Sequence, residues 1–221
     1  MVKIKRVVSK RLSRRPDEFI TIWAKIINYV TSNTKVFYTA LSIAIGVAVV
    51  LTGLSFLYVY AQREASGVLN KGIDAYHSAG GSEEGLTTAL ASFDGVIKKY
   101  YFTDSRKIAF LYRGHIYYDL GEYEEALNSY KKAERRLSGP FKDLATEGMA
   151  YTYLKMKDYD DAVEILKKLL DPEDEESYLM LISTLEKAGD SEQLKEYRVK
   201  FISLFPESPQ LDYIKNLSEG K

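Results

Sequence analysis

Charged residues are missing from one long stretch near the start of the chain. No Asp, Glu, Lys or Arg occurs in the 25 residues from 36 to 60, which read VFYTALSIAIGVAVVLTGLSFLYVY. A helix of this length rises roughly 37 Å at about 1.5 Å per residue, and the hydrocarbon core of a bilayer is about 30 Å thick. The pattern therefore predicts a transmembrane helix over residues 36–60.

Two other structures can hold an apolar run of this kind. The core helix of a soluble protein rarely lacks charge on every face for about seven turns. A cleavable signal peptide has an apolar core of about 7–15 residues behind a short basic start. Here the core is longer, 35 residues precede it, and the Val-Tyr-Ala sequence at 59–61 is a loose imitation of a cleavage site. An uncleaved anchor is therefore the preferred interpretation.

A second apolar pattern precedes this run. Pro16, Asp17 and Glu18 suit the first turn of a helix, and apolar residues then recur with helical spacing. The sequence predicts an amphipathic helix over residues 16–31. Because Trp and a basic flank favour anionic headgroups, we expect its stripe at the inner membrane interface, and a groove on a cytosolic or membrane partner is the alternative. The stripe consists of Phe19, Ile22, Trp23, Ile26, Ile27 and Val30.

Residues 61–221 repeat the pattern of a helical hairpin. The clearest unit, residues 107–140, has a bulky, a small and an aromatic residue in its first helix, then Ala, an aromatic and Ala in its second. These are Phe110, Gly114, Tyr117, Ala126, Tyr130 and Ala133, with Gly121 and Tyr123 at the turn. The spacing resembles the tetratricopeptide repeat, a helical hairpin of about 34 residues. We expect Gly121 to cap the first helix in a left-handed conformation, and Gly114 and Ala126 to mark where the two helices touch.

Three further units follow the same pattern less closely, over residues 66–104, 143–174 and 175–206, and residues 208–221 form a capping tail. Ala89, Ala126, Ala162 and Leu194 recur at intervals of 37, 36 and 32 residues, each close to one repeat length. The resemblance implies an all-α fold, in which a single N-terminal transmembrane helix precedes a tetratricopeptide-repeat solenoid. In such a solenoid each hairpin buries its apolar face on its neighbours.

The resemblance also implies a binding surface. In this family the first helix of each repeat lines a concave groove that holds peptides or partner proteins. Register transfers this role to ten residues whose mixture of aromatic, aliphatic and a few charged side chains suits polypeptide recognition. They are Ile108, Leu111, His115, Tyr118, Asp119, Leu144, Glu147, Tyr151, Leu154 and Lys155. The alternative is that several of them pack against the other end of the solenoid or the linker helix.

Composition removes several kinds of chemistry. The absence of cysteine excludes disulfides, cysteine-bearing zinc and iron–sulfur sites, and thiol chemistry. His77 and His115 alone offer little for a metal or acid–base site. The acidic run at 171–176 has Glu176 where a calcium loop needs glycine, and no phosphate-binding loop, nucleophile elbow or zinc-protease motif occurs. We therefore expect no enzyme activity, no cofactor and no metal.

The formal net charge of zero conceals two opposite parts. Residues 1–35 carry nine Lys and Arg but two acidic residues. Subtracting these from the chain's 31 basic and 31 acidic residues leaves 22 and 29 for residues 61–221. The positive-inside rule then predicts a cytoplasmic segment over 1–35 and an exported domain over 61–221, with lipid contacts through residues 16–60. A neutral total favours no nucleic-acid partner.

The complete layout is similar to a second family, the ancillary subunit of the bacterial Sec translocon. The shared features are a basic cytoplasmic segment, one span and an exported, degenerate tetratricopeptide domain. The resemblance implies a single-pass protein of the bacterial inner membrane, whose periplasmic repeats work with the translocon and membrane-anchored chaperones on emerging polypeptides. Two other hypotheses remain open: an envelope-assembly or cell-division scaffold, and a transmembrane regulatory protein acting through its cytoplasmic helix.

Overall fold

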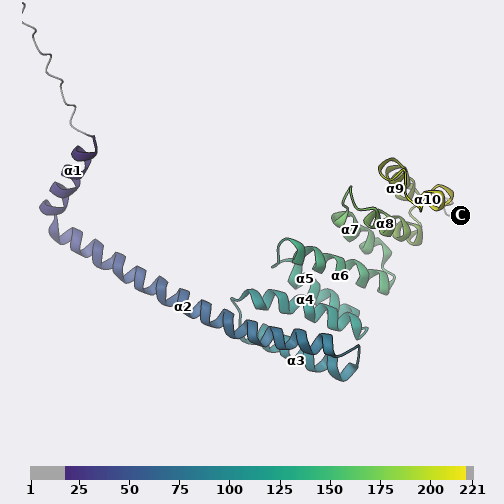
Figure 1. The fold of residues 1–221 in the computed structure, drawn as a ribbon, viewed down its shortest axis with the longest axis horizontal. Helices are drawn as coiled ribbons and strands as arrows, with labels where there is room; N and C mark the ends of the chain where they lie inside the picture. The colour runs from purple at the N-terminus through teal and green to yellow at the C-terminus, as the bar shows by residue number, and fades with distance from the viewer. Residues whose placement is uncertain (1–17, 218–221) are drawn as a thin grey trace, which may run out of the picture. The chain divides into compact units, whose positions relative to one another are not determined.

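The computed structural model describes residues 18–217, which fold into ten helices without a strand (Figure 1). This confirms the all-α fold class predicted from the sequence. The helices are α1 (Glu18–Ser32), α2 (Thr34–Ser78), α3 (Glu83–Lys99), α4 (Asp104–Asp119), α5 (Tyr123–Glu134), α6 (Pro140–Met156), α7 (Tyr159–Leu169), α8 (Glu175–Ala188), α9 (Ser191–Leu204) and α10 (Leu211–Asn216).

The chain divides into two compact units, and the division falls in the sequence after Phe56. The described part of the first unit contains α1 and the beginning of α2. Asn33 is the single residue between these helices, and helical hydrogen bonding continues across it: the Asn33 amide donates to the Tyr29 carbonyl, and the Phe37 amide donates to the Asn33 carbonyl, both at 3.0 Å. The helix predicted over residues 16–31 thus corresponds to α1, and positions 16 and 17 lie outside the described residues.

Helix α2 contains the uncharged run and continues well beyond it. Its 45 residues include positions 36–60 and also form the first helix of the first hairpin. Its most apolar 18-residue stretch has a mean hydropathy of 2.3, and none of that stretch is buried. Across residues 18–217, α2 is the one helix long and apolar enough to cross a membrane. The boundary predicted at residues 60 and 61 lies inside this helix.

The second unit stacks four helical hairpins. The end of α2 lies along α3 (Figure 1). Helix α4 then pairs with α5, α6 with α7, and α8 with α9, and α10 packs on α9. The end of α2 and α3 pack closely, since a Cβ added at Gly72 of α2 would lie 3.0 Å from the ring of Phe93 in α3. The first unit predicted at residues 66–104 therefore has no separate first helix, since the end of α2 supplies it.

Left-handed residues end the first helix of the later hairpins. After α4, Gly121 has φ of 77°. The Glu122 amide donates to the Tyr117 carbonyl at 2.8 Å, and the Gly121 amide donates to the Tyr118 carbonyl at 3.0 Å, which is the Schellman arrangement. This confirms the predicted cap. After α6, Lys157 takes the same conformation with φ of 64°, although a side chain there costs about 1–2 kcal/mol.

The ring of Tyr130 in α5 lies between two glycines. Tyr130 is 1% exposed. A Cβ added at Gly114 of α4 would lie 2.5 Å from this ring, and so would one added at Gly148 of α6. The close approach predicted at Gly114 is therefore confirmed, because nothing larger than hydrogen fits there. Gly148 has the same function on the other side of the ring and joins one repeat to the next.

Replacing a helical glycine by alanine has two opposite effects on stability: it raises helix propensity, and it crowds any side chain that packs against the glycine. Alanine exceeds glycine in helix propensity by about 1 kcal/mol, and overpacking a core costs about 1–3 kcal/mol. We expect Gly148→Ala to lower the free energy of unfolding. Gly95→Ala, in α3, should raise it because an added Cβ meets nothing within 4 Å. Urea denaturation of the full chain in detergent, followed by circular dichroism, measures both. Equal effects would show that Tyr130 moves aside without cost.

Candidate functional site

A cavity of about 430 Å³ opens between α4 and α6. Its wall combines aromatic, aliphatic and carboxylate side chains, and the buried ring of Tyr130 lies beneath it. The lining residues are His115, Tyr118 and Asp119 from α4, Tyr130 from α5, and Leu144, Glu147, Gly148 and Tyr151 from α6.

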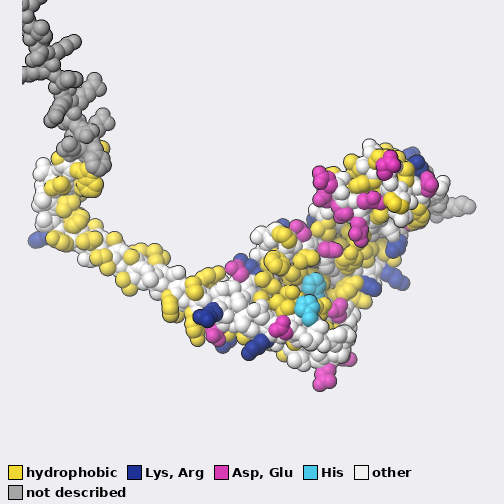
Figure 2. Space-filling model, in the orientation of Figure 1, with side chains coloured by type: hydrophobic (Ala, Val, Ile, Leu, Met, Phe, Trp, Pro, Cys, Tyr) yellow, Lys and Arg dark blue, Asp and Glu magenta, His cyan; other side chains and the backbone are white. Residues whose placement is uncertain are grey.

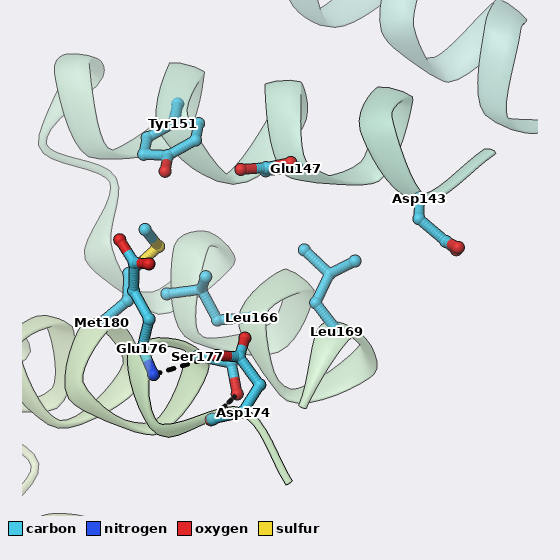
Figure 3. Close-up of a pocket in the computed structure, with 9 residues that line it drawn as sticks. All are labelled: Asp143, Glu147, Tyr151, Leu166, Leu169, Asp174, Glu176, Ser177 and Met180. Atoms are coloured by element: carbon cyan, nitrogen blue, oxygen red, sulfur yellow. Dashed lines mark hydrogen bonds between the residues drawn. The ribbon is translucent and has the colours of Figure 1, made fainter. Parts of the chain in front are cut away.

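A second cavity of about 250 Å³ lies on the other side of α6, against α7 and α8 (Figure 3). Its lining residues are Asp143, Glu147, Tyr151, Leu166, Leu169, Asp174, Glu176, Ser177 and Met180. Glu147 and Tyr151 line both cavities. The two cavities are therefore adjacent along α6, and we call them together the groove.

The groove contains six of the ten residues predicted from the repeat register. His115, Tyr118, Asp119, Leu144, Glu147 and Tyr151 line it. The other four do not line either cavity. Leu111 is 2% exposed and belongs to the core, which corrects its assignment to the groove surface. Ile108 and Leu154 are partly buried and pack against that core, and Lys155 is exposed outside both cavities.

The physical reason for this difference is that the groove crosses the helices obliquely. On α4 it is lined by the last two turns, from His115 to Asp119. On α6 it is lined by residues from Asp143 to Tyr151, and on α8 by residues that begin in the first turn at Glu176. A small rotation between successive repeats twists a solenoid, so the same register position opens to the groove in one repeat and is covered in another.

The register transfer missed the contribution of α7 and α8. Leu166 and Leu169 come from α7, and Glu176, Ser177 and Met180 come from α8. The transfer used only the two best-matching repeats, and extending the same register to α8 places Glu176 in the position of Ile108. Nothing within its own repeat marked Gly148 as a residue that lines the cavity, because Tyr130, on which it packs, belongs to the preceding repeat.

Polar contacts hold the α4 side of the groove. The Tyr130 hydroxyl oxygen lies 2.8 Å from Nδ1 of His115, so the two groups share a hydrogen bond. The Tyr76 hydroxyl, from the end of α2, donates to Oδ2 of Asp119 at 2.8 Å. The ring of Tyr112 packs edge-on against His115, with centroids 6.0 Å apart. Figure 2 shows histidine side chains on a face where hydrophobic side chains gather.

Electrostatically the groove is acidic. Burial lowers the pKa of His115 below its usual 6.5, against the smaller opposing effect of the Asp119 carboxylate, so the imidazole is neutral at pH 7. Burial, followed by the nearby Glu147 carboxylate, raises the pKa of Tyr151. Within residues 18–217, no Lys or Arg lines either cavity, whereas five carboxylates line them: Asp119, Asp143, Glu147, Asp174 and Glu176.

The apolar stripe predicted before the span lies on α1. Ile22, Trp23, Ile26 and Ile27 are all exposed, and Val30 is partly buried. The side chain of Phe19 lies outside the described ones. An exposed apolar stripe of this kind needs a lipid or protein surface to cover it, so its membrane contact stays a prediction.

Comparison with protein families identifies the repeat type. Residues 114–135 match a TPR repeat model, and residues 148–171 match a tetratricopeptide repeat model. The first match covers the end of α4 and all of α5, and the second covers the end of α6 and all of α7. A comparison with curated proteins finds no significant match. The chain is therefore a helical solenoid that carries tetratricopeptide repeats, which are protein-interaction modules.

The position of His115 makes stability depend on pH. Because folding lowers its pKa, the unfolded chain binds more protons between the folded-state pKa and 6.5. The contribution of neutral His115 to the free energy of unfolding is therefore complete above pH 6.5, and it is lost as the pH falls from 6.5 through the folded-state pKa. We expect the free energy of unfolding to decrease from about pH 7.5 to about pH 5.5, and to decrease less in His115→Gln. His77→Gln changes an exposed histidine and is the matched control. An unchanged pH dependence in His115→Gln would contradict this role.

Proposed function

We propose that this protein is a membrane-anchored scaffold whose groove binds a segment of a partner polypeptide. The observation that carries the proposal is the groove itself, built on two hairpins that match tetratricopeptide models. Tyr118, Leu144 and Tyr151 supply apolar contact area, and carboxylates beside them supply orientation. Such a mixture is typical of surfaces that recognise polypeptides.

The charge of the groove indicates the chemistry of its ligand. Asp119 and Glu147 line the first cavity, Glu147 and Glu176 the second, and no Lys or Arg of the described part of the chain lines either cavity. Electrostatic complementarity then favours a segment that carries Lys or Arg together with aliphatic or aromatic residues. Exposed charge pairs contribute about 0.2–1 kcal/mol each, so apolar contact supplies most of the affinity and charge supplies selectivity.

The anchor in this proposal is the first part of α2. Its apolar side chains are exposed, among them Phe56 at 71%, and a lipid bilayer is the environment that covers such a surface on all sides. The nine basic residues before the run favour a cytoplasmic N-terminus and an exported repeat domain. In this orientation the stripe of α1 lies at the inner membrane interface.

The layout supports a more specific setting. A basic segment, one span and exported tetratricopeptide repeats suit an accessory of the Sec translocon in the bacterial inner membrane. There the groove receives polypeptide segments at the exit of the channel, together with periplasmic chaperones. A segment rich in basic and apolar residues, still unfolded as it emerges, has the extended backbone that such a groove accommodates.

Photocrosslinking in cells tests the partner. A photoreactive amino acid replaces Tyr151, which lines both cavities, or Val199 of α9, which is exposed and lines neither. We expect adducts from position 151 that contain translocon subunits, their chaperones or secretory polypeptides, and no such adducts from position 199. Adducts that contain only peptidoglycan or outer-membrane machinery would overturn the translocon setting. Equal labelling at the two positions would contradict the proposal that the groove binds the partner.

The yield of the same adducts measures how much the groove carboxylates contribute to binding. Asp119→Asn combined with Glu147→Gln removes two carboxylates while keeping side-chain size. We expect this variant to weaken binding by about 2- to 30-fold, which corresponds to about 0.4–2 kcal/mol for two charges. Glu124→Gln combined with Glu192→Gln removes two exposed carboxylates outside the groove and is the matched control. An equal loss in both double variants would show that only overall charge matters.

Reporter fusions test the orientation. Alkaline phosphatase, which folds only after export, is fused after Lys221 or after Ser32, the last residue of α1. We expect activity from the first fusion, because α2 exports the repeat domain, and none from the second, which ends before the span. An alkaline phosphatase fusion at Lys221 that is made but inactive would overturn the proposed topology.

A further inference from the structure

The loop between α3 and α4 exposes two aromatic side chains. Phe102 is 90% exposed, the highest value for a large hydrophobic side chain in the described chain, and Tyr101 beside it is 60% exposed. The neighbouring Tyr100 and Thr103 are buried. Exposing a phenylalanine ring so completely to water is unfavourable, so we expect these two side chains to contact an apolar environment.

Hydrogen bonds fix where this loop lies along α2. The backbone amide of Asp104 donates to Oε1 of Gln62 at 2.9 Å, and the Tyr58 hydroxyl donates to Oδ2 of Asp104 at 3.4 Å. Tyr58 lies two residues before the end of the uncharged run at Tyr60, and Gln62 lies two residues after it. Each step is about 3 Å along the helix axis. The loop is therefore held beside the point on α2 where the uncharged run ends.

Further contacts make the loop rigid. The Arg106 guanidinium donates from Nε to the Ile97 carbonyl at 3.0 Å and from Nη1 to the Tyr101 carbonyl at 3.3 Å. Its Cζ lies 4.6 Å from the centroid of the Tyr101 ring. The Thr103 hydroxyl donates to the Tyr100 carbonyl at 3.0 Å and caps α4 by accepting from the Arg106 amide. A preorganised loop loses little conformational entropy when its aromatic rings bind.

The charges around the loop differ from those of the rest of the repeat domain. Residues 98–107 carry four basic side chains, Lys98, Lys99, Arg106 and Lys107, and a single carboxylate, Asp104. That carboxylate pairs with Lys107 at 2.7 Å. Residues 61–221 as a whole carry more acidic than basic side chains. A basic patch beside exposed aromatic rings matches an anionic lipid surface, where basic residues attract headgroups and aromatic rings occupy the interface.

We propose that the α3–α4 loop is a second membrane contact, in which Tyr101 and Phe102 enter the interface of the bilayer that α2 crosses. Lys98 and Lys99 lie over anionic headgroups beside them. This inference rests on the proposed span, because the end of the uncharged run sets the level of the interface. The contact holds the first hairpin at the membrane surface, so that the hairpins carrying the groove project from a fixed base.

Tryptophan quenching by brominated lipid tests this contact. In the full chain with Trp23→Phe, which removes the single native tryptophan, one tryptophan is introduced by Phe102→Trp, Phe56→Trp or Tyr213→Trp. Each protein is reconstituted in vesicles of phosphatidylcholine and phosphatidylglycerol, with or without brominated acyl chains. We expect brominated lipid to reduce the emission of Phe102→Trp and Phe56→Trp. The emission of Tyr213→Trp, an exposed position in the last helix, should not change.

The three positions separate the possible failures. Quenching at position 56 without quenching at 102 would overturn the loop contact and leave the span intact. Absence of quenching at both positions would overturn the span and the loop contact together. Equal quenching at 102 and 213 would show non-specific adsorption of the repeat domain and would also overturn the loop contact. Because the vesicles contain no other protein, a loop that docks on a protein partner gives the first of these results.

Discussion

The packing of Tyr130 between Gly114 and Gly148 is the contact on which the repeat domain depends. A ring this large fits between α4 and α6 only because both helices present a hydrogen atom in place of a side chain. The ring joins two consecutive hairpins, and its hydroxyl reaches His115 at the floor of the groove. One residue of the second helix in a repeat therefore sets both the spacing of the neighbouring first helices and the depth of the cavity between them.

The groove follows from the same stacking. Because successive hairpins are rotated relative to one another, the groove runs from the end of α4 across the first half of α6 to the start of α8. Carboxylates from three helices thereby converge on a surface that no Lys or Arg among the described residues lines. Asp174 also has a structural role, because it caps α8 by accepting a hydrogen bond from the Glu176 amide at 3.1 Å. One carboxylate that lines the groove therefore also caps a helix.

Helix α2 gives the second constraint. The uncharged run and the first helix of the first hairpin belong to one uninterrupted helix, so the hairpin begins where the apolar residues end. Gln62 and Tyr58 then bind the start of α4, which places the aromatic loop of residues 100–103 beside that boundary. A polar residue placed just after an apolar run thus has two effects, because it ends the hydrophobic segment and positions a loop distant in sequence.

Local patterns in the sequence determined the helical class, the repeat register, the cap at Gly121 and the small residue required at Gly114. Each depends on residues within one hairpin, whose spacing is set by the 3.6-residue period and by backbone sterics. The tertiary structure decided which faces of the first helices open to the groove, placing Leu111 in the core and Glu176 on the surface. It also gave Gly148 its role against Tyr130. These depend on rotation and close packing between hairpins, which no single hairpin encodes and which arise only when the repeats stack.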